Sequence, residues 1–300
     1  MKILISGSNG LVGSALMNSL KGDGHDVFAL VRRAPHADAE VEWYPERGSL
    51  ALARLEGMDA VVHLAGESIA EGRWTDERKR SIRESRVKGT TVLSEALANL
   101  KHPPQTLLCA SAIGYYGDRG DEILTEESVP GNDFLANVCI EWERATRTAA
   151  EKGIRVVNLR FGIILSAEGG ALAKMLPPFR MGAGGRIGSG KQWMSWIALD
   201  DVVGVIKFAL ASDALRGPVN VVAPNPVTNA EFTKTLGKVL SRPTLFPIPA
   251  FGLRLAFGEM ADALLLSSQR VEPVKLKQTG YHFRYSELET ALRRVLSKAA

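Results

Sequence analysis

Apolar runs alternate with helix-like patterns along the first half of the chain. Between the runs, apolar positions recur at helical spacing near residues 11–22, 75–99 and 133–152. This alternation predicts parallel strands joined by right-handed crossover helices, which is the pattern of a doubly wound α/β sheet. The strand-like runs are Ile3–Ser6, Asp26–Val31, Ala60–Ala65, Thr106–Ser111 and Arg155–Arg160.

Polar residues mark the ends of two of these helices. Thr75 is a candidate N-cap, followed by Asp76 and Glu77, whose negative charge favours the first turn. Asp133 is a second candidate N-cap, and Gly153 is a candidate C′ residue after the same helix.

The pattern changes after about residue 165, where glycine-rich and proline-rich segments interrupt the chain. The predicted elements there are a helix over 199–211, a strand over 218–222, a helix over 229–240 and more helix after Pro243–Pro249. We therefore expect a Rossmann domain over residues 1–165 and a smaller C-terminal substrate or cap subdomain over 166–300, part of which returns to the sheet. Ligands of open α/β sheets bind beyond the carboxyl ends of the strands, so this subdomain would cover a substrate. Its segment Gly188–Trp196 holds two tryptophans, which could form a mobile lid or pack in the core.

The connection between the first strand and the first helix is rich in glycine. It is Gly7-Ser8-Asn9-Gly10-Leu11-Val12-Gly13, a GxxGxxG spacing. Glycines at such a turn let the backbone approach a pyrophosphate, while helix N–H groups and the positive end of the dipole face the anion. We interpret this segment as a dinucleotide-binding turn; the alternative is a plain structural turn.

The end of the second strand indicates which dinucleotide is bound. An acid there would bond the ribose 2′-hydroxyl of NAD, whereas basic residues accommodate the 2′-phosphate of NADP. Here Val31 is followed by Arg32 and Arg33, and no acid occurs before Asp38. Two guanidinium groups can fork onto a phosphate, so the sequence favours NADP(H). The alternative is that both arginines lie on a solvated loop.

Composition excludes several other classes of protein. The chain is 45% hydrophobic, and 37 basic against 33 acidic residues leave a small, dispersed net charge of +4, so we expect no nucleic-acid partner. No apolar run reaches membrane-spanning length, and the N-terminal residues lack a signal-peptide pattern. The only cysteines, Cys109 and Cys139, make no disulfide framework. We therefore expect a cytoplasmic protein without membrane contact.

The motifs at the strand ends resemble those of extended short-chain dehydrogenases/reductases, a superfamily that includes nucleotide-sugar epimerases and dehydratases. They are the glycine turn, Val62-His63-Leu64-Ala65-Gly66, and Ser111 with Tyr115-Tyr116-Gly117. Further segments are similar to atypical epimerase-family proteins with a C-terminal domain of unknown function, some of which are labelled cell-division inhibitors. These segments are Leu64–Glu67, Arg73–Thr75, Ser85-Arg86, Trp142-Glu143, Gly184–Gly190 and Ser195–Ile197. The likeness covers nearly the whole chain, including a family-specific segment over about 247–296.

The resemblance implies which residues contact the cofactor. Besides the glycine turn and Arg32, it implies Leu64, Ala65 and Gly66 at the end of a buried strand, and Arg86 on the long helix. The residues alone leave alternatives, because Leu64 could be a packing residue and Arg86 could be solvated.

The catalytic pattern of the superfamily is incomplete here. Active members use a Ser and a Tyr-x-x-x-Lys pair, in which the Lys lowers the pKa of a phenol that otherwise titrates near 10. Ser111 occupies the Ser position, but the window for the pair, Phe134–Cys139, contains neither Tyr nor Lys. Tyr116 or Tyr115 could substitute as the acid/base, although either could be a binding or packing residue.

Other candidate groups have simpler interpretations. Glu67 could act as an acid/base or be solvated, and Cys139 is interpreted as an inert buried thiol. His63 is interpreted as a hydrogen-bonded core histidine, and no His, Cys, Asp and Glu spacing predicts a metal site.

Two hypotheses for the function remain. The first is an NADP(H)-dependent oxidoreductase or epimerase-like enzyme on a small polar substrate, with Ser111 polarising the reacting oxygen and Tyr116 or Tyr115 assisting. The second is a catalytically degenerate NADP(H)-binding sensor or scaffold that acts through a protein partner. The resemblance also makes a homodimer possible, because superfamily relatives often pair through two helices. The sequence names neither the substrate nor the direction of the reaction.

Overall fold

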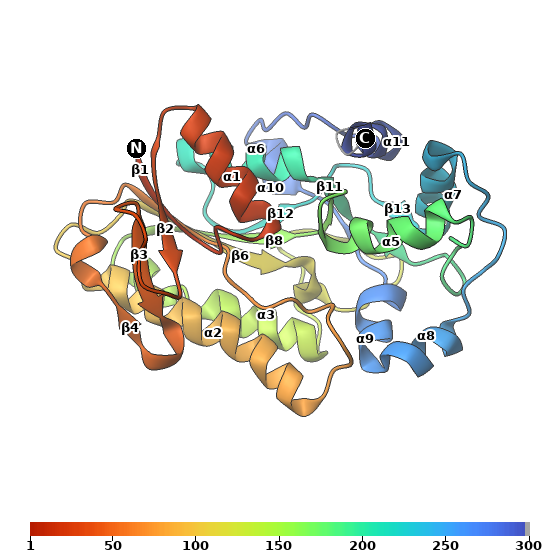
Figure 1. The fold of residues 1–300 in the computed structure, drawn as a ribbon, viewed down its shortest axis with the longest axis horizontal. Helices are drawn as coiled ribbons and strands as arrows, with labels where there is room; N and C mark the ends of the chain where they lie inside the picture. The colour runs from red at the N-terminus through yellow and green to blue at the C-terminus, as the bar shows by residue number, and fades with distance from the viewer. Residues whose placement is uncertain (298–300) are drawn as a thin grey trace.

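The predicted strands form one large sheet in the computed structural model, which describes residues 1–297 (Figure 1). Seven neighbouring strands run parallel, and the last strand folds back antiparallel on β3. From one edge to the other, the order is β12 (Gly217–Val221), β8 (Arg155–Phe161), β6 (Thr106–Ala112), β5 (Ala60–His63), β1 (Lys2–Ser6), β2 (Asp26–Val31), β3 (Glu40–Tyr44) and β4 (Ser49–Leu50). This arrangement confirms the predicted doubly wound α/β fold.

The strands differ in how clearly their sequences predict them. Ile3, Leu4 and Ile5 of β1 are all fully buried, because a central parallel strand is covered on both faces. By contrast, β3 was not among the predicted strand-like runs. Only Val41 and Trp43 of β3 are buried, and they alternate with Glu40 and Glu42, so this strand lacks a continuous apolar run.

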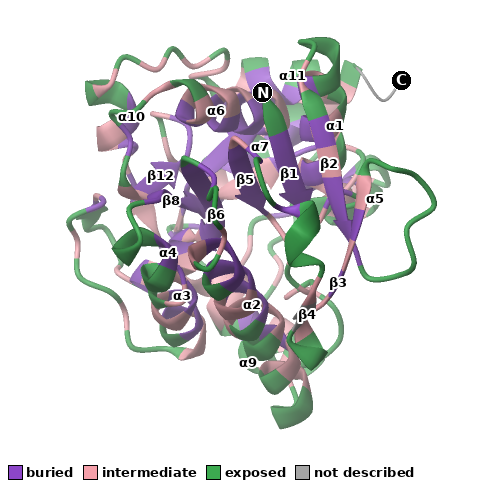
Figure 2. Cartoon of the chain, turned by 90° about the vertical axis from the view of Figure 1, so that its left-hand side faces the viewer, coloured by how far each residue is buried: buried purple, intermediate pink, exposed green. Residues whose placement is uncertain are grey.

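Helices cover both faces of the sheet, and the buried side chains lie between the layers (Figures 1 and 2). One face carries α1 (Leu11–Gly22), α6 (Leu199–Ala211) and α10 (Val274–Gln278), and the other carries α2 (Asp76–Ala98), α3 (Phe134–Arg144) and α4 (Arg147–Glu151). None of the helices within residues 1–297 is long and apolar enough to cross a membrane.

The predicted helix ends are confirmed, with one correction. Thr75 and Asp133 each accept the backbone N–H three residues on, at 3.2 and 2.8 Å, and Gly153 follows α4 with a φ of +86°. The predicted helix over 133–152 is divided into α3 and α4. Between them, the Thr146 hydroxyl donates to the carbonyl of Glu143 at 2.7 Å, a local bond that competes with the helical pattern.

The second half of the chain contributes to two cores. Part of it joins the large sheet, since β12 pairs with β8 and α6 packs on α1. The remainder packs around its own apolar cluster. Its elements are β9 (Ile163–Leu165), α5 (Gly170–Arg180), β10 (Trp193–Met194), β11 (Trp196–Ala198), β13 (Val227–Thr228), α7 (Asn229–Leu240) and α11 (Leu288–Ser297).

The chain between α7 and α11 is held against the rest of the molecule by short elements. These are α8 (Ala250–Phe257), α9 (Glu259–Ala261), a π-helical turn (Asp262–Leu266) and β14 (Arg270–Val271), which pairs with β7 (Ile123–Leu124). Further on, the buried carboxylate of Asp201 in α6 accepts the backbone N–H groups of Arg284 and Tyr285 at 2.8 and 3.0 Å. These bonds attach the last residues before α11 to α6.

The two tryptophans of the glycine-rich segment are both engaged. Trp196 is fully buried, and its indole N–H donates to the carbonyl of Asn225 at 3.0 Å. Trp193 donates to Asp121 at 2.9 Å, and the guanidinium of Arg270 lies 4.4 Å from its ring centre. For Trp196, core packing is therefore the correct interpretation, while Trp193 is fixed by polar contacts at the surface.

Candidate functional site

The glycine turn packs directly against the end of β5. Gly7 has a φ of +69°, which favours glycine, and a Cβ there would lie 2.8 Å from the carbonyl carbon of Leu64. A Cβ at Gly13 would lie 2.8 Å from the carbonyl carbon of Gly7 and would overlap its oxygen. Gly10 N–H donates to that same oxygen at 3.0 Å. Glycine is therefore required at positions 7 and 13 by the tight turn between β1 and α1, whereas a Cβ at Gly10 would make one close contact, 3.2 Å from the Gly7 oxygen.

This turn leaves the start of α1 suited to an anion. Gly10 is the N-cap residue and makes no side-chain cap, so the first N–H groups and the helix dipole are available to a ligand. Leu11 and Val12 point their side chains elsewhere, the first toward Gly169 and the second into the core. Asn9 is exposed and Ser8 is buried. The residues present fit a pyrophosphate bound by backbone N–H groups.

A buried network ties the end of β5 to the end of β1. The Ser6 hydroxyl accepts the N–H groups of Leu64 and Ala65 at 3.1 and 3.2 Å, and it lies 2.6 Å from His63 Nδ1. His63 Nε2 lies 3.0 Å from the Thr90 hydroxyl. Burial lowers the pKa of His63 to about 4, so the ring is neutral. The interpretation of His63 as a hydrogen-bonded core histidine is confirmed.

The two arginines after β2 have different surroundings. Arg33 makes a two-pronged ion pair with Glu40, Nη1–Oε2 at 2.8 Å and Nη2–Oε1 at 2.6 Å. Arg32 is exposed, and within residues 1–297 it makes no hydrogen bond or ion pair. The face of Arg33 formed by Nη1 and Nη2 is therefore occupied by the carboxylate of Glu40, seven residues further along the chain, whereas the guanidinium of Arg32 is available to a ligand.

Arg86 reaches from α2 to the end of β5. Its guanidinium lies against Gly66, where a Cβ would be 3.4 Å from Cζ, and packs 5.1 Å from the ring centre of Trp142. It donates to the carbonyls of Glu67 and Ile82 at 2.9 and 3.0 Å, and burial lowers its pKa. Arg86 is therefore not solvated; it holds the chain that follows the implied cofactor contacts.

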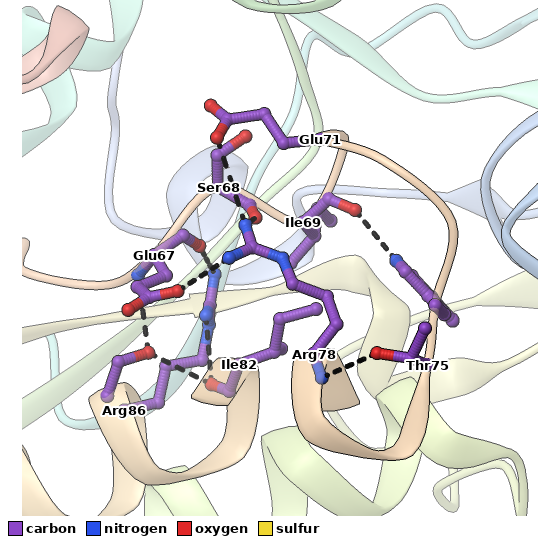
Figure 3. Close-up of polar contacts among 10 residues, drawn as sticks. Glu67, Ser68, Ile69, Glu71, Thr75, Arg78, Ile82 and Arg86 are labelled. Atoms are coloured by element: carbon purple, nitrogen blue, oxygen red, sulfur yellow. Dashed lines mark hydrogen bonds and ion pairs between the residues drawn. The ribbon is translucent and has the colours of Figure 1, made fainter. Parts of the chain in front are cut away.

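The loop after β5 is fixed by a second arginine of α2. Figure 3 shows the guanidinium of Arg78 between Glu67, Ser68 and Glu71. It bonds the Glu67 carboxylate at 2.8 Å and the carbonyl of Ser68, and it lies 3.9 Å from Glu71. The Glu67 carboxylate is therefore neither free nor simply solvated, since it forms an ion pair that shapes this loop.

The hydroxyl of Ser111 is bound to a buried ion pair. Ser111 is only 2% exposed and donates to Glu143 Oε1 at 2.7 Å. Glu143 also accepts two bonds from Arg160, Nε–Oε1 at 2.7 Å and Nη2–Oε2 at 2.8 Å. Because Ser111 donates its hydrogen to a carboxylate, its oxygen can still accept a bond but does not polarise another oxygen by donation.

The two tyrosines after β6 differ in accessibility. Tyr116 is fully buried; its hydroxyl donates to Asn220 at 2.7 Å and accepts from Arg160 at 2.9 Å. Burial raises the pKa of Tyr116 to about 12, which opposes an acid/base role near neutral pH. Tyr115 is half-buried, and the Arg160 guanidinium lies 3.5 Å from its ring centre. The surroundings of Tyr116 are those of a packing residue.

The predicted set lacked four charged residues that hold the site together: Glu40, Arg78, Glu143 and Arg160. For Arg160 and Glu143, the available signal was an arginine at the end of the apolar run Arg155–Arg160, because a buried arginine needs an acidic partner.

Cys139 is buried and its pKa is raised to about 12 by that burial, which agrees with an inert thiol. Within residues 1–297, no group of three His, Cys, Asp or Glu residues is placed to bind a metal.

The fold and the glycine turn define a nucleotide-binding protein of the extended short-chain dehydrogenase/reductase type. Residues 3–222 match the NAD dependent epimerase/dehydratase family, and residues 248–295 match a domain of unknown function, DUF1731. The chain therefore belongs to the NAD dependent epimerase/dehydratase family, and the predicted C-terminal segment is present.

Individual relatives support this assignment. The chain is 46% identical over 290 residues to "Epimerase family protein Mb2239" of Mycobacterium bovis, covering 97% of this chain and 96% of the relative. It superposes on the crystal structure of human epimerase family protein SDR39U1 (isoform 2) with NADPH, with a TM-score of 0.92, 34% identity and 99% of both chains covered. A Bacillus cereus UDP-N-acetylglucosamine 4-epimerase shares the fold, with a TM-score of 0.77 at 19% identity over 98% of each chain.

Proposed function

We propose that this protein binds NADP(H) and acts as an oxidoreductase or epimerase-like enzyme on a small polar substrate. The observation that carries the proposal is the turn of Gly7, Gly10 and Gly13, which brings the uncapped start of α1 to the carboxyl end of the sheet. A pyrophosphate at this position would receive backbone N–H bonds and the field of the helix dipole. The end of β5, held by Ser6 and Arg86, would border the nicotinamide half of the cofactor.

The preference for NADP(H) rests on the charge at the end of β2. Arg32 is exposed there without a partner among the described residues, and the acid that would suit an NAD ribose is absent from this position. The human relative, whose crystal structure contains NADPH, supports the same preference.

The chemistry that we propose uses the groups around Ser111. When bound, the cofactor would supply or accept hydride. Because Glu143 is paired with Arg160 and accepts the hydrogen of Ser111, the Ser111 oxygen would accept a bond from a substrate hydroxyl. Tyr115, which borders the same ion pair and is not fully buried, is the phenol that we propose as the assisting group.

A specific observation favours a second function, an NADP(H)-binding sensor or scaffold without catalysis. The hydroxyls of Ser111 and Tyr116 both bond to the buried Glu143–Arg160 pair, and Phe134–Cys139 holds no Tyr or Lys. Such a protein would signal its cofactor state to a partner protein rather than turn over a substrate.

Calorimetric titration with NADPH and NADH tests the binding proposal. After removal of co-purified nucleotide, we expect NADPH to bind more tightly than NADH by on the order of ten- to a hundredfold, the effect of one or two charge-assisted bonds. Equal affinities would refute the NADP(H) preference, and no binding of either nucleotide would refute the proposed function.

Catalysis is tested by NADPH oxidation with a panel of aldehydes, ketones and keto-sugars. We expect Ser111→Ala to abolish turnover of any substrate found while leaving NADPH affinity nearly unchanged. Full activity of Ser111→Ala would refute the role of Ser111. NADPH binding without turnover across the panel would favour the sensor.

A further inference from the structure

The paired arginines after β2 have separate roles. Resting on the proposed NADP(H) binding, we propose that Arg32 alone binds the 2′-phosphate and that Glu40 is a positioning residue for this site. In this arrangement Glu40 holds Arg33 and the turn from β2 to β3 in place, and Arg33 neutralises Glu40 so that the carboxylate does not repel the phosphate.

Arg33 is engaged by the carboxylate of Glu40. Both terminal nitrogens of its guanidinium are bonded to the two oxygens of Glu40, at 2.8 and 2.6 Å, and Nη1 also donates to the carbonyl of Ala34 at 3.0 Å. Glu40 therefore occupies the two-pronged face that Nη1 and Nη2 of this guanidinium form. To bind a phosphate in the same way, Arg33 would have to leave Glu40.

Glu40 also holds the connection between β2 and β3. Besides Arg33, its Oε2 accepts the backbone N–H of His36 at 2.7 Å. Glu40 is the first residue of β3 and lies opposite Ala29 of β2. One carboxylate therefore bonds the beginning and the middle of the connection between the two strands, and Arg33 keeps its pKa near 2, so it remains charged at neutral pH.

Arg32 carries the positive charge that remains available to a ligand after β2. Arg33 and Glu40 cancel each other, whereas Arg32 is exposed and has no partner within residues 1–297. Arg32 directly follows β2, which lies beside β1 and its glycine turn. The net positive charge at the place expected for the 2′-phosphate is therefore that of Arg32.

This division of roles makes a prediction that two equivalent phosphate ligands would not make. Removing Arg33 alone exposes an uncompensated carboxylate near the phosphate, so Arg33→Ala should weaken NADPH binding. Removing the carboxylate as well should restore most of that loss. If Arg33 instead bound the phosphate directly, Glu40→Gln would release it and tighten NADPH binding.

The experiment is calorimetric titration of the full chain with NADPH and with NADH, using Arg32→Ala, Arg33→Ala, Glu40→Gln and the double variant of Arg33 and Glu40. Glu42→Gln is the matched control, because Glu42 is two residues along the same strand and its loss changes the net charge equally. Thermal unfolding of each variant confirms that it is folded.

We expect Arg32→Ala to weaken NADPH binding by on the order of ten- to a hundredfold and NADH binding hardly at all. Glu40→Gln should weaken NADPH binding several-fold, Glu42→Gln should not change it, and the double variant should bind NADPH more tightly than Arg33→Ala. An unrestored double variant, or tighter NADPH binding by Glu40→Gln, would overturn this inference while leaving the proposed function intact. Failure of the unmodified protein to prefer NADPH would instead overturn the NADP(H) proposal and this inference with it.

Discussion

Lowering the pH from 7 to 4 should destabilise the protein through His63, the buried last residue of β5. The Ser6 hydroxyl accepts two backbone N–H groups, so its own hydrogen points to Nδ1 of His63. This assigns the ring proton to Nε2, which donates to Thr90. A second proton on Nδ1 would face the Ser6 hydroxyl, break its bond and bury a positive charge.

The magnitude follows from the lowered pKa. Burial takes the pKa of His63 from an ordinary 6.5 to about 4 in the folded chain. Between these values the unfolded chain binds a proton that the folded chain does not, so stability falls as the pH falls. At about 1.36 kcal/mol for each pKa unit, the loss at pH 4 is about 3 kcal/mol, and the full contribution is present only above the unfolded value.

The assay is urea unfolding at a series of pH values from 7 to 4. His63→Asn keeps an acceptor for Ser6 and does not titrate, so its stability should fall by about 3 kcal/mol less than that of the unmodified protein. His282→Gln is the control, because it removes an exposed histidine and leaves His63 in place. Parallel curves for the unmodified protein and His63→Asn would refute the reasoning.

Three further predictions concern the turn and the buried ion pair. Gly13→Ala should abolish NADPH binding and lower the stability by about 1–3 kcal/mol through overpacking. Its control, Gly22→Ala, places a methyl group in open space in the same helix and should be neutral or stabilising by up to about 1 kcal/mol. Calorimetry and urea unfolding check both variants, and tight NADPH binding by Gly13→Ala would contradict the role of the glycine turn. Glu143→Gln should lower the free energy of unfolding in urea by about 3–5 kcal/mol, because it leaves the buried guanidinium of Arg160 without a counter-ion. The control Glu151→Gln, in an exposed pair, should change that free energy by less than about 0.5 kcal/mol. Similar effects of the two variants would argue against a structural ion pair. Tyr116→Phe removes two buried hydrogen bonds and should lower the stability by about 1–2 kcal/mol, without changing NADPH affinity or any turnover. Lost turnover at unchanged stability would instead identify a catalytic tyrosine.

Much of the fold could be predicted because its signals are local. A run such as Ile3–Ser6 needs only its own apolar residues to indicate a buried strand, and a cap such as Thr75 bonds an N–H three residues away. The glycine turn is equally local, since the positive φ of Gly7 is a property of one residue. Where local signals were weak, as in β3, the prediction missed the element, because its pairing with β2 and β4 and the burial of Val41 and Trp43 depend on the tertiary structure.

The roles of individual side chains were harder to predict. Arg32 and Arg33 are neighbours of the same type, and nothing in the sequence pattern distinguishes them. They differ because the pairing of β2 with β3 brings Glu40 to Arg33 and not to Arg32. The burial of Tyr116 has a similar origin, since its hydroxyl meets Asn220, a residue that arrives from β12.

The sequence by itself determined the alternating elements, the glycine turn, the family and the class of cofactor, because these depend on periodicity, backbone conformation and short motifs. Only the tertiary structure decided which charges are free and which hydroxyls are bound. Ser111 lies opposite Arg160 because β6 pairs with β8, and α3 then supplies Glu143 to both. Partners so far apart along the chain meet only through strand register and helix packing, and a buried charge takes the partner that this packing provides.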